Sequence, residues 1–137
     1  MYKRQNLYWA NNRHFHHSIE KFNEQLIILS SLFILIGHIF PIWLRFKGGK
    51  GFASYLGIVF MINFYLFSFI ALIWIFIFLV IRISSLSALI SSFSSILLTY
   101  FLFNSDELLI FILTLIIFIS HYENIKRLVN GTEKKIK

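Results

Sequence analysis

The most constraining feature of this sequence is a long stretch, residues 52–120, that is almost free of charge. Its only Lys, Arg, Asp or Glu residues are Arg82, Asp106 and Glu107. Of the 137 residues, 58% are hydrophobic and 14% are charged, whereas soluble chains are about one quarter charged. A soluble domain of this length could not bury so much apolar surface. The composition therefore predicts an all-α integral membrane protein.

The apolar runs predict five transmembrane helices, some of them short. Phe52–Ile81 is too long for one ordinary span, so we expect two short helices that break near Asn63–Ser68. The single spans are expected over Leu26–Leu44, Leu86–Phe103 and Glu107–Ser120. With this break, Lys50, Arg82 and the basic tail lie on one side of the membrane, which obeys the positive-inside rule. That side is predicted to be cytoplasmic.

The first 25 residues differ from the rest of the chain. They are polar, rich in Asn, His and basic residues, and lack the apolar core of a secretory signal. We therefore divide the chain into residues 1–25, a polar segment that is either foreign sequence or a divergent loop, and residues 26–137, the membrane domain. There is no cysteine, and we expect neither a metal site nor a cofactor. The net charge of +7 sits at the ends and in short loops, which favours membrane lipids over nucleic acid as partners.

Glycine and lysine alternate in one loop between two apolar runs. Gly48, Gly49, Lys50 and Gly51 can form a backbone concavity whose N–H groups point at an anion, beside the N-terminus of the next helix. Basic residues that flank a span often do no more than mark its cytoplasmic end. Surface charge alone does not require three glycines, so the pattern favours a phosphate-binding loop. Arg45 and Lys47 would attract anions to it.

A second polar cluster follows the last apolar run. His121 and Asn124 are three residues apart and share one helical face, with Arg127 beside them. An imidazole, an amide and a guanidinium together could hold a phosphate and a hydroxyl. The alternative is a basic helix end that only reaches toward water. That alternative does not account for the amide of Asn124, three residues after His121.

These two clusters resemble signatures of a known family. The run Gly37-His38-Ile39-Phe40-Pro41 through Phe46–Gly51 resembles the second signature of the bacterial acyl-phosphate-dependent glycerol-3-phosphate acyltransferases. The segment His121–Glu133, with Asn124, Arg127 and Gly-Thr-Glu, resembles the third. Ser54 stands where the family usually has Thr, and Tyr122 where it commonly has Arg. The resemblance extends from about Leu26 to Glu133.

The resemblance implies acyl transfer from a fatty acyl-phosphate to sn-glycerol 3-phosphate. The products would be 1-acylglycerol 3-phosphate (lysophosphatidic acid) and phosphate, at the cytoplasmic face of the bacterial inner membrane, in the first step of phospholipid synthesis. On this hypothesis the glycine loop, with His38 orienting it, binds a phosphate. His121 and Asn124 then position glycerol 3-phosphate or the developing oxyanion. An acyl phosphate is already activated, so no protein nucleophile is required.

Part of the family pattern is missing. The family has seven spans and begins with one span followed by a Gly-Ser-Gly-Asn signature, which has no match here, so the resemblance implies an N-terminally truncated chain. Alternative functions are a non-catalytic membrane scaffold or an inactive fragment of the enzyme. A transporter is disfavoured because charged groups at mid-span and repeated halves are absent from the sequence.

Overall fold

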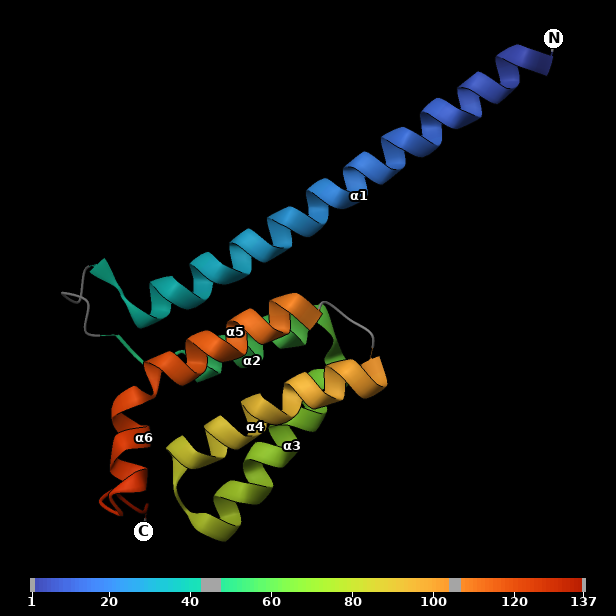
Figure 1. Ribbon diagram of the computed structural model, residues 1–137. Helices are drawn as coiled ribbons and strands as arrows, with labels where there is room; N and C mark the ends of the chain where they lie inside the picture. Colours follow the sequence, from blue (N-terminus) through green and yellow to red (C-terminus); the bar gives the residue numbers. More distant parts are fainter. Residues whose placement is uncertain (1, 43–47, 104–106, 137) are drawn as a thin grey trace. The chain divides into compact units, whose positions relative to one another are not determined.

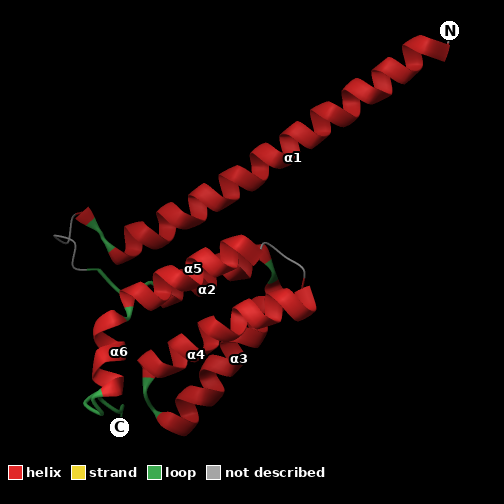
Figure 2. Cartoon of the chain, in the orientation of Figure 1, coloured by secondary structure: helices red, strands yellow, loops and turns green. Residues whose placement is uncertain are grey.

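The computed structural model describes residues 2–42, 48–103 and 107–136, with side chains described from Lys21 onward. Within those ranges the chain is helical and contains no strand (Figures 1 and 2). The helices are α1 (Tyr2–Ile39), α2 (Phe52–Ile62), α3 (Phe64–Ile81), α4 (Ser84–Leu98), a π-helical turn (Thr99–Phe103), α5 (Glu107–Ser120) and α6 (Tyr122–Val129). The predicted all-α membrane class is confirmed.

The chain forms two units, Met1–Phe33 and Ile34–Lys137, of which the second contains the helical bundle. Residues 2–25 of the polar segment, in which the sequence has no apolar run, belong to the long helix α1. That helix ends at Ile39, five residues before the expected Leu44. The reason is Pro41, which lacks an N–H and disfavours helical backbone at the residue before it.

The predicted break within Phe52–Ile81 is present at Asn63. Its backbone is extended (φ −153°, ψ 110°), and its side-chain oxygen accepts hydrogen bonds from the N–H groups of Tyr65 and Leu66, both at 3.0 Å. An Asn at this position caps the next helix by pairing N–H groups that have no partner within it. One residue therefore ends α2 and starts α3.

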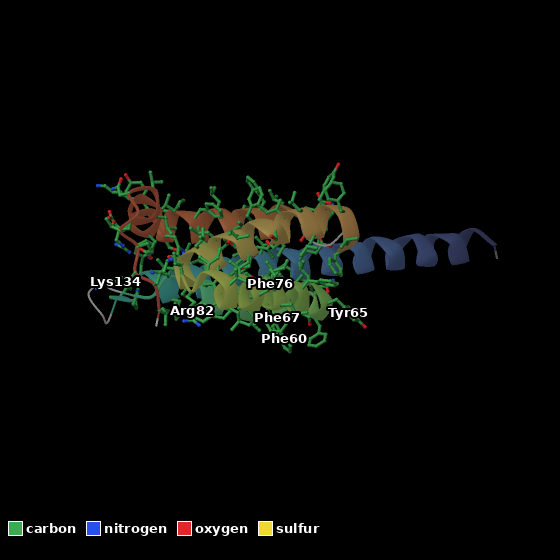
Figure 3. All side chains as sticks on the ribbon, turned by 90° about the horizontal axis from the view of Figure 1, so that it is seen from below. Phe60, Tyr65, Phe67, Phe76, Arg82 and Lys134 are labelled. Atoms are coloured by element: carbon green, nitrogen blue, oxygen red, sulfur yellow. The ribbon has the colours of Figure 1, made fainter. Side chains whose placement is uncertain are left out.

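The bundle core joins α2, α4 and α5 through hydroxyl groups as well as apolar side chains. Tyr55 is fully buried, and its hydroxyl lies 2.5 Å from Ser95 Oγ and 3.2 Å from Thr114 Oγ1. Other serines of α4, such as Ser87 and Ser91, donate to carbonyl oxygens one turn earlier. The serine run thus serves close helix packing. The outer surface is apolar; Phe60 and Tyr65 lie on it (Figure 3).

The predicted helices do not all reach the length of a membrane span. Among the residues that the structure describes, three helical stretches are long and apolar enough to cross a membrane: Lys21–Ile39, Phe64–Ile81 and Ser84–Phe103. The α5–α6 pair, bent by 62°, would make a fourth, and α2 has only 11 residues. The chain is therefore a multi-pass membrane protein by its helices, while the count of five crossings remains a prediction.

Helix order brings the polar ends of the bundle together. The N-terminus of α2, the turn between α3 and α4, and the C-terminus of α5 lie at one end. Ser120 Oγ donates to the carbonyl of Lys50 at 2.8 Å, and the N–H of Ile136 donates to the carbonyl of Arg82 at 2.8 Å. Figure 3 shows Arg82 and Lys134 at this end and Tyr65 at the other. The basic groups of the bundle thus gather at one end, as the two-helix interpretation of Phe52–Ile81 required.

Candidate functional site

The glycine loop packs tightly against the end of α1. A side chain at Gly48 would collide with the carbonyl oxygens of His38 and Ile39. A Cβ at Gly49 would lie 2.9 Å from Nε2 of His38. Gly51 has φ 77°, a left-handed backbone that glycine adopts at little cost, and it directly precedes α2. Close packing therefore accounts for all three glycines, and it places His38 against the loop it was expected to orient.

The corner between α5 and α6 is fixed to this loop. His121 is 2% exposed, and its Nδ1 lies 2.8 Å from the carbonyl oxygen of Ile117. A neutral ring in this contact carries its proton on Nδ1, which leaves Nε2 as an acceptor. Ser120 connects the two parts, because its hydroxyl donates to the Lys50 carbonyl and lies 3.2 Å from Nδ1 of His121.

Glu133 organises the polar side chains beyond this corner. One of its oxygens accepts hydrogen bonds from Ser85 Oγ and Asn124 Nδ2, both at 2.6 Å. The other accepts from Arg127 Nε at 2.7 Å. The Glu133 side chain is only 10% exposed. Three segments meet at one carboxylate: the start of α4, helix α6 and the tail.

The pKa of Glu133 follows from these contacts. Burial raises the pKa of this carboxyl, but hydrogen bonds from Ser85, Arg127 and Asn124, together with the charge of Arg127, outweigh that effect. They lower the pKa from 4.5 to about 2. Glu133 is therefore ionised at neutral pH and acts as a structural acceptor. Its charge holds Asn124 and Arg127 in place.

A pocket of about 400 Å³ opens among these groups. It is lined by Lys50, Asn124, Arg127, Thr132, Glu133 and Lys134. Three predicted site residues therefore share one cavity, although they come from the glycine loop and from α6. His38, Gly48, Gly49, Gly51 and His121 lie around the loop and the α5–α6 corner and are not among the lining residues. Arg45 and Lys47 fall outside the described residues.

Sequence reasoning assigned no role to several residues of the site. Thr132 and Glu133 were noted only within the third signature, and Lys134 only as one of the basic residues of the tail. The Gly-Thr-Glu segment was the available signal for Glu133. Nothing local to Ser85 indicates that it meets a residue 48 positions later.

Fold and site together define the class. The chain is a multi-pass helical membrane protein with a cationic, hydrogen-bonded pocket at one end of its bundle. A family model described as glycerol-3-phosphate acyltransferase matches residues 8–131. The chain belongs to this glycerol-3-phosphate acyltransferase family. The match begins upstream of Leu26, where the resemblance was expected to start.

Individual relatives agree with this assignment. The glycerol-3-phosphate acyltransferase of Ehrlichia canis is 40% identical over 115 residues, covering 83% of this chain and 60% of the relative. That of Pelagibacter ubique is 42% identical over 118 residues, covering 85% of this chain and 62% of the relative. The chain thus spans about 60% of the length of these curated relatives.

Solved structures show the same arrangement of helices. A crystal structure of PlsY (YgiH), an integral membrane glycerol 3-phosphate acyltransferase, in its glycerol 3-phosphate form matches with a TM-score of 0.71 and 32% identity. The match covers 75% of this chain and 52% of that one. A second structure of the same enzyme, in its lysophosphatidic acid form, matches with a TM-score of 0.70.

Proposed function

We propose that this chain carries the phosphate-binding part of an acyltransferase that acts on glycerol 3-phosphate. The observation that carries the proposal is the shared pocket, in which Lys50, Asn124 and Arg127 meet at the polar end of a membrane bundle. Membership of the family and the glycerol 3-phosphate form of the related enzyme support the choice of acceptor. The lysophosphatidic acid form of that enzyme supports the product.

The donor proposed from the sequence is a fatty acyl-phosphate. The 1-hydroxyl oxygen of glycerol 3-phosphate forms a bond to the acyl carbonyl carbon, and the bond from that carbon to the phosphate oxygen breaks. Inorganic phosphate leaves and takes up the hydroxyl proton. The acyl chain belongs in the bilayer and both phosphates belong at its surface, so a site at the end of the bundle can align the two substrates. Alignment of an activated donor supplies much of the acceleration.

Three side chains of the site have a proposed part. Lys50 binds phosphate by charge, with the amides of the glycine loop beside it. Asn124 has one N–H on Glu133 and a second available for substrate. His121 positions the glycerol hydroxyl by accepting a hydrogen bond from it at Nε2, because Ile117 occupies the other ring nitrogen. We propose that the site faces the cytoplasm at the inner membrane, where soluble glycerol 3-phosphate is available.

The test is acyl transfer by the purified chain, with palmitoyl phosphate and radiolabelled glycerol 3-phosphate. Lys50→Met is expected to lose at least tenfold in activity, a change of about 1.4 kcal/mol, and Lys126→Met, on the same end but outside the pocket, is expected to keep it. His121→Ala is expected to lower kcat. Near-normal turnover by Lys50→Met would refute the proposed phosphate-binding role of the glycine loop. Unchanged turnover by His121→Ala would refute the proposed role of His121 as acceptor for the glycerol hydroxyl.

A further inference from the structure

The C-terminal tail is held in place on both sides of Lys134. After α6, Gly131 adopts φ 69°, and the N–H of Thr132 donates back to the carbonyl of Arg127 at 2.8 Å. This turn, made possible by glycine, reverses the chain. We refer to Thr132–Ile136 as the C-terminal strap.

The strap is anchored to the turn between α3 and α4. Before Lys134, Glu133 accepts a hydrogen bond from Ser85 at 2.6 Å. After it, the N–H of Ile136 donates to the carbonyl of Arg82 at 2.8 Å. Chain ends are usually free unless tied down. Here two anchors fix the chain around Lys134 and Lys135, and of these two Lys134 lines the pocket together with Lys50 and Arg127.

The charge of the pocket depends on this lysine. Its lining carries three cations, Lys50, Arg127 and Lys134, and one carboxylate, Glu133. That carboxylate is ionised at neutral pH and is paired with Arg127 at 2.7 Å. The lining therefore has a net charge of +2, which would be +1 without Lys134. A phosphate monoester carries about −1.5 to −2 charges at pH 7, so only the full set of cations matches it.

We propose that Lys134, held by the C-terminal strap, is a phosphate-binding residue of this pocket and that its ligand is a small phosphate monoester. The proposal rests on the proposed function for the identity of that monoester, glycerol 3-phosphate. Binding of phosphate itself depends only on the pocket. The neighbouring Lys135 does not line the pocket, although it has the same charge and similar exposure. Its position makes it a matched control.

The experiment compares Lys134→Met, Lys134→Arg and Lys135→Met in maltoside micelles, which contain no phosphate. Isothermal titration calorimetry with inorganic phosphate and with glycerol 3-phosphate gives the affinity for each ligand. The acyl-transfer assay gives KM and kcat separately. Lys134→Met is expected to weaken both ligands by roughly tenfold, or ~1.4 kcal/mol, and to raise KM with little change in kcat. Lys134→Arg and Lys135→Met are expected to bind like the parent chain.

The outcomes separate the two proposals. Equal affinities for Lys134→Met and Lys135→Met, whether both unchanged or both weakened, would overturn the assignment of Lys134 and leave the proposed function standing. A parent chain that binds phosphate but transfers no acyl group would overturn the proposed function, and Lys134 would then be judged by phosphate affinity alone. A parent chain that binds neither ligand would overturn both.

Discussion

Removing the Glu133 carboxylate should destabilise the bundle by an amount that the structure sets. Ser85 and Asn124, which donate to one of its oxygens, are 5% and 3% exposed. A buried donor left without a partner costs about 1–3 kcal/mol. Arg127 is 45% exposed, so water screens its ion pair, which contributes less than about 1 kcal/mol. We therefore expect Glu133→Ala to lose about 2–5 kcal/mol, mostly from the two buried donors.

Glu133→Gln separates the contribution of the negative charge from that of the hydrogen bonds, because Gln has nearly the same shape as Glu. Its amide oxygen can face Ser85 and Asn124 and keep both hydrogen bonds, which lose only their ionic strengthening. The expected loss is about 1–2 kcal/mol, smaller than for Ala. Unfolding is followed by tryptophan fluorescence during titration of mixed micelles with SDS. The control is Glu123→Ala, at an exposed position of α6.

Two results would refute this reasoning. One is a free energy of unfolding for Glu133→Ala equal to that of Glu123→Ala, and the other is a larger loss for Gln than for Ala. Acid provides an independent check. Because folding lowers the pKa of Glu133 from 4.5 to about 2, its contribution to stability is complete above pH 4.5 and is lost as the pH falls toward 2. The Gln variant should lack this part of the acid dependence.

Three further changes test the packing around the site. Gly48→Ala should destabilise the bundle by about 3 kcal/mol or more in the same SDS titration, because its Cβ meets backbone oxygens that cannot move aside. Its control is Gly57→Ala, in open space within α2, which should be neutral or stabilise the bundle by about 0.5–1 kcal/mol. Tyr55→Phe should cost about 1 kcal/mol or less by thermal unfolding, since its hydroxyl partners keep a carbonyl acceptor. Ser120→Ala should weaken phosphate binding several-fold, measured by calorimetry, with a stability loss of only about 0.5–1.5 kcal/mol, because it frees the Lys50 carbonyl. A phosphate affinity unchanged in Ser120→Ala would contradict the last expectation.

Several features could be predicted from local sequence because their causes are local. Apolar runs of span length indicate membrane helices whatever surrounds them, since lipid leaves the backbone no other partners. The break at Asn63 is likewise local, because the same residue supplies the cap. The end of α1 was placed five residues too late, although Pro41 was a local signal for it. The glycine loop and the polar face of α6 were identified because glycine and charge are rare in residues 52–120, which separate them.

The tertiary structure decided which of these polar groups meet. No periodicity relates Ser85 to Glu133 or Lys50 to Ser120, pairs separated by 48 and 70 positions. Their spacing predicted one helical face for His121 and Asn124, yet His121 lies at the bend between α5 and α6, buried against Ile117, while Asn124 lines the pocket. Lys134 and Lys135 are indistinguishable by composition and lie between the same two anchors, yet Lys134 lines the pocket and Lys135 does not. The sequence by itself determined a helical membrane protein of this acyltransferase family. The pocket, its charge and its structural carboxylate came from contacts between distant segments, because packing, and not local pattern, determines which residues become neighbours.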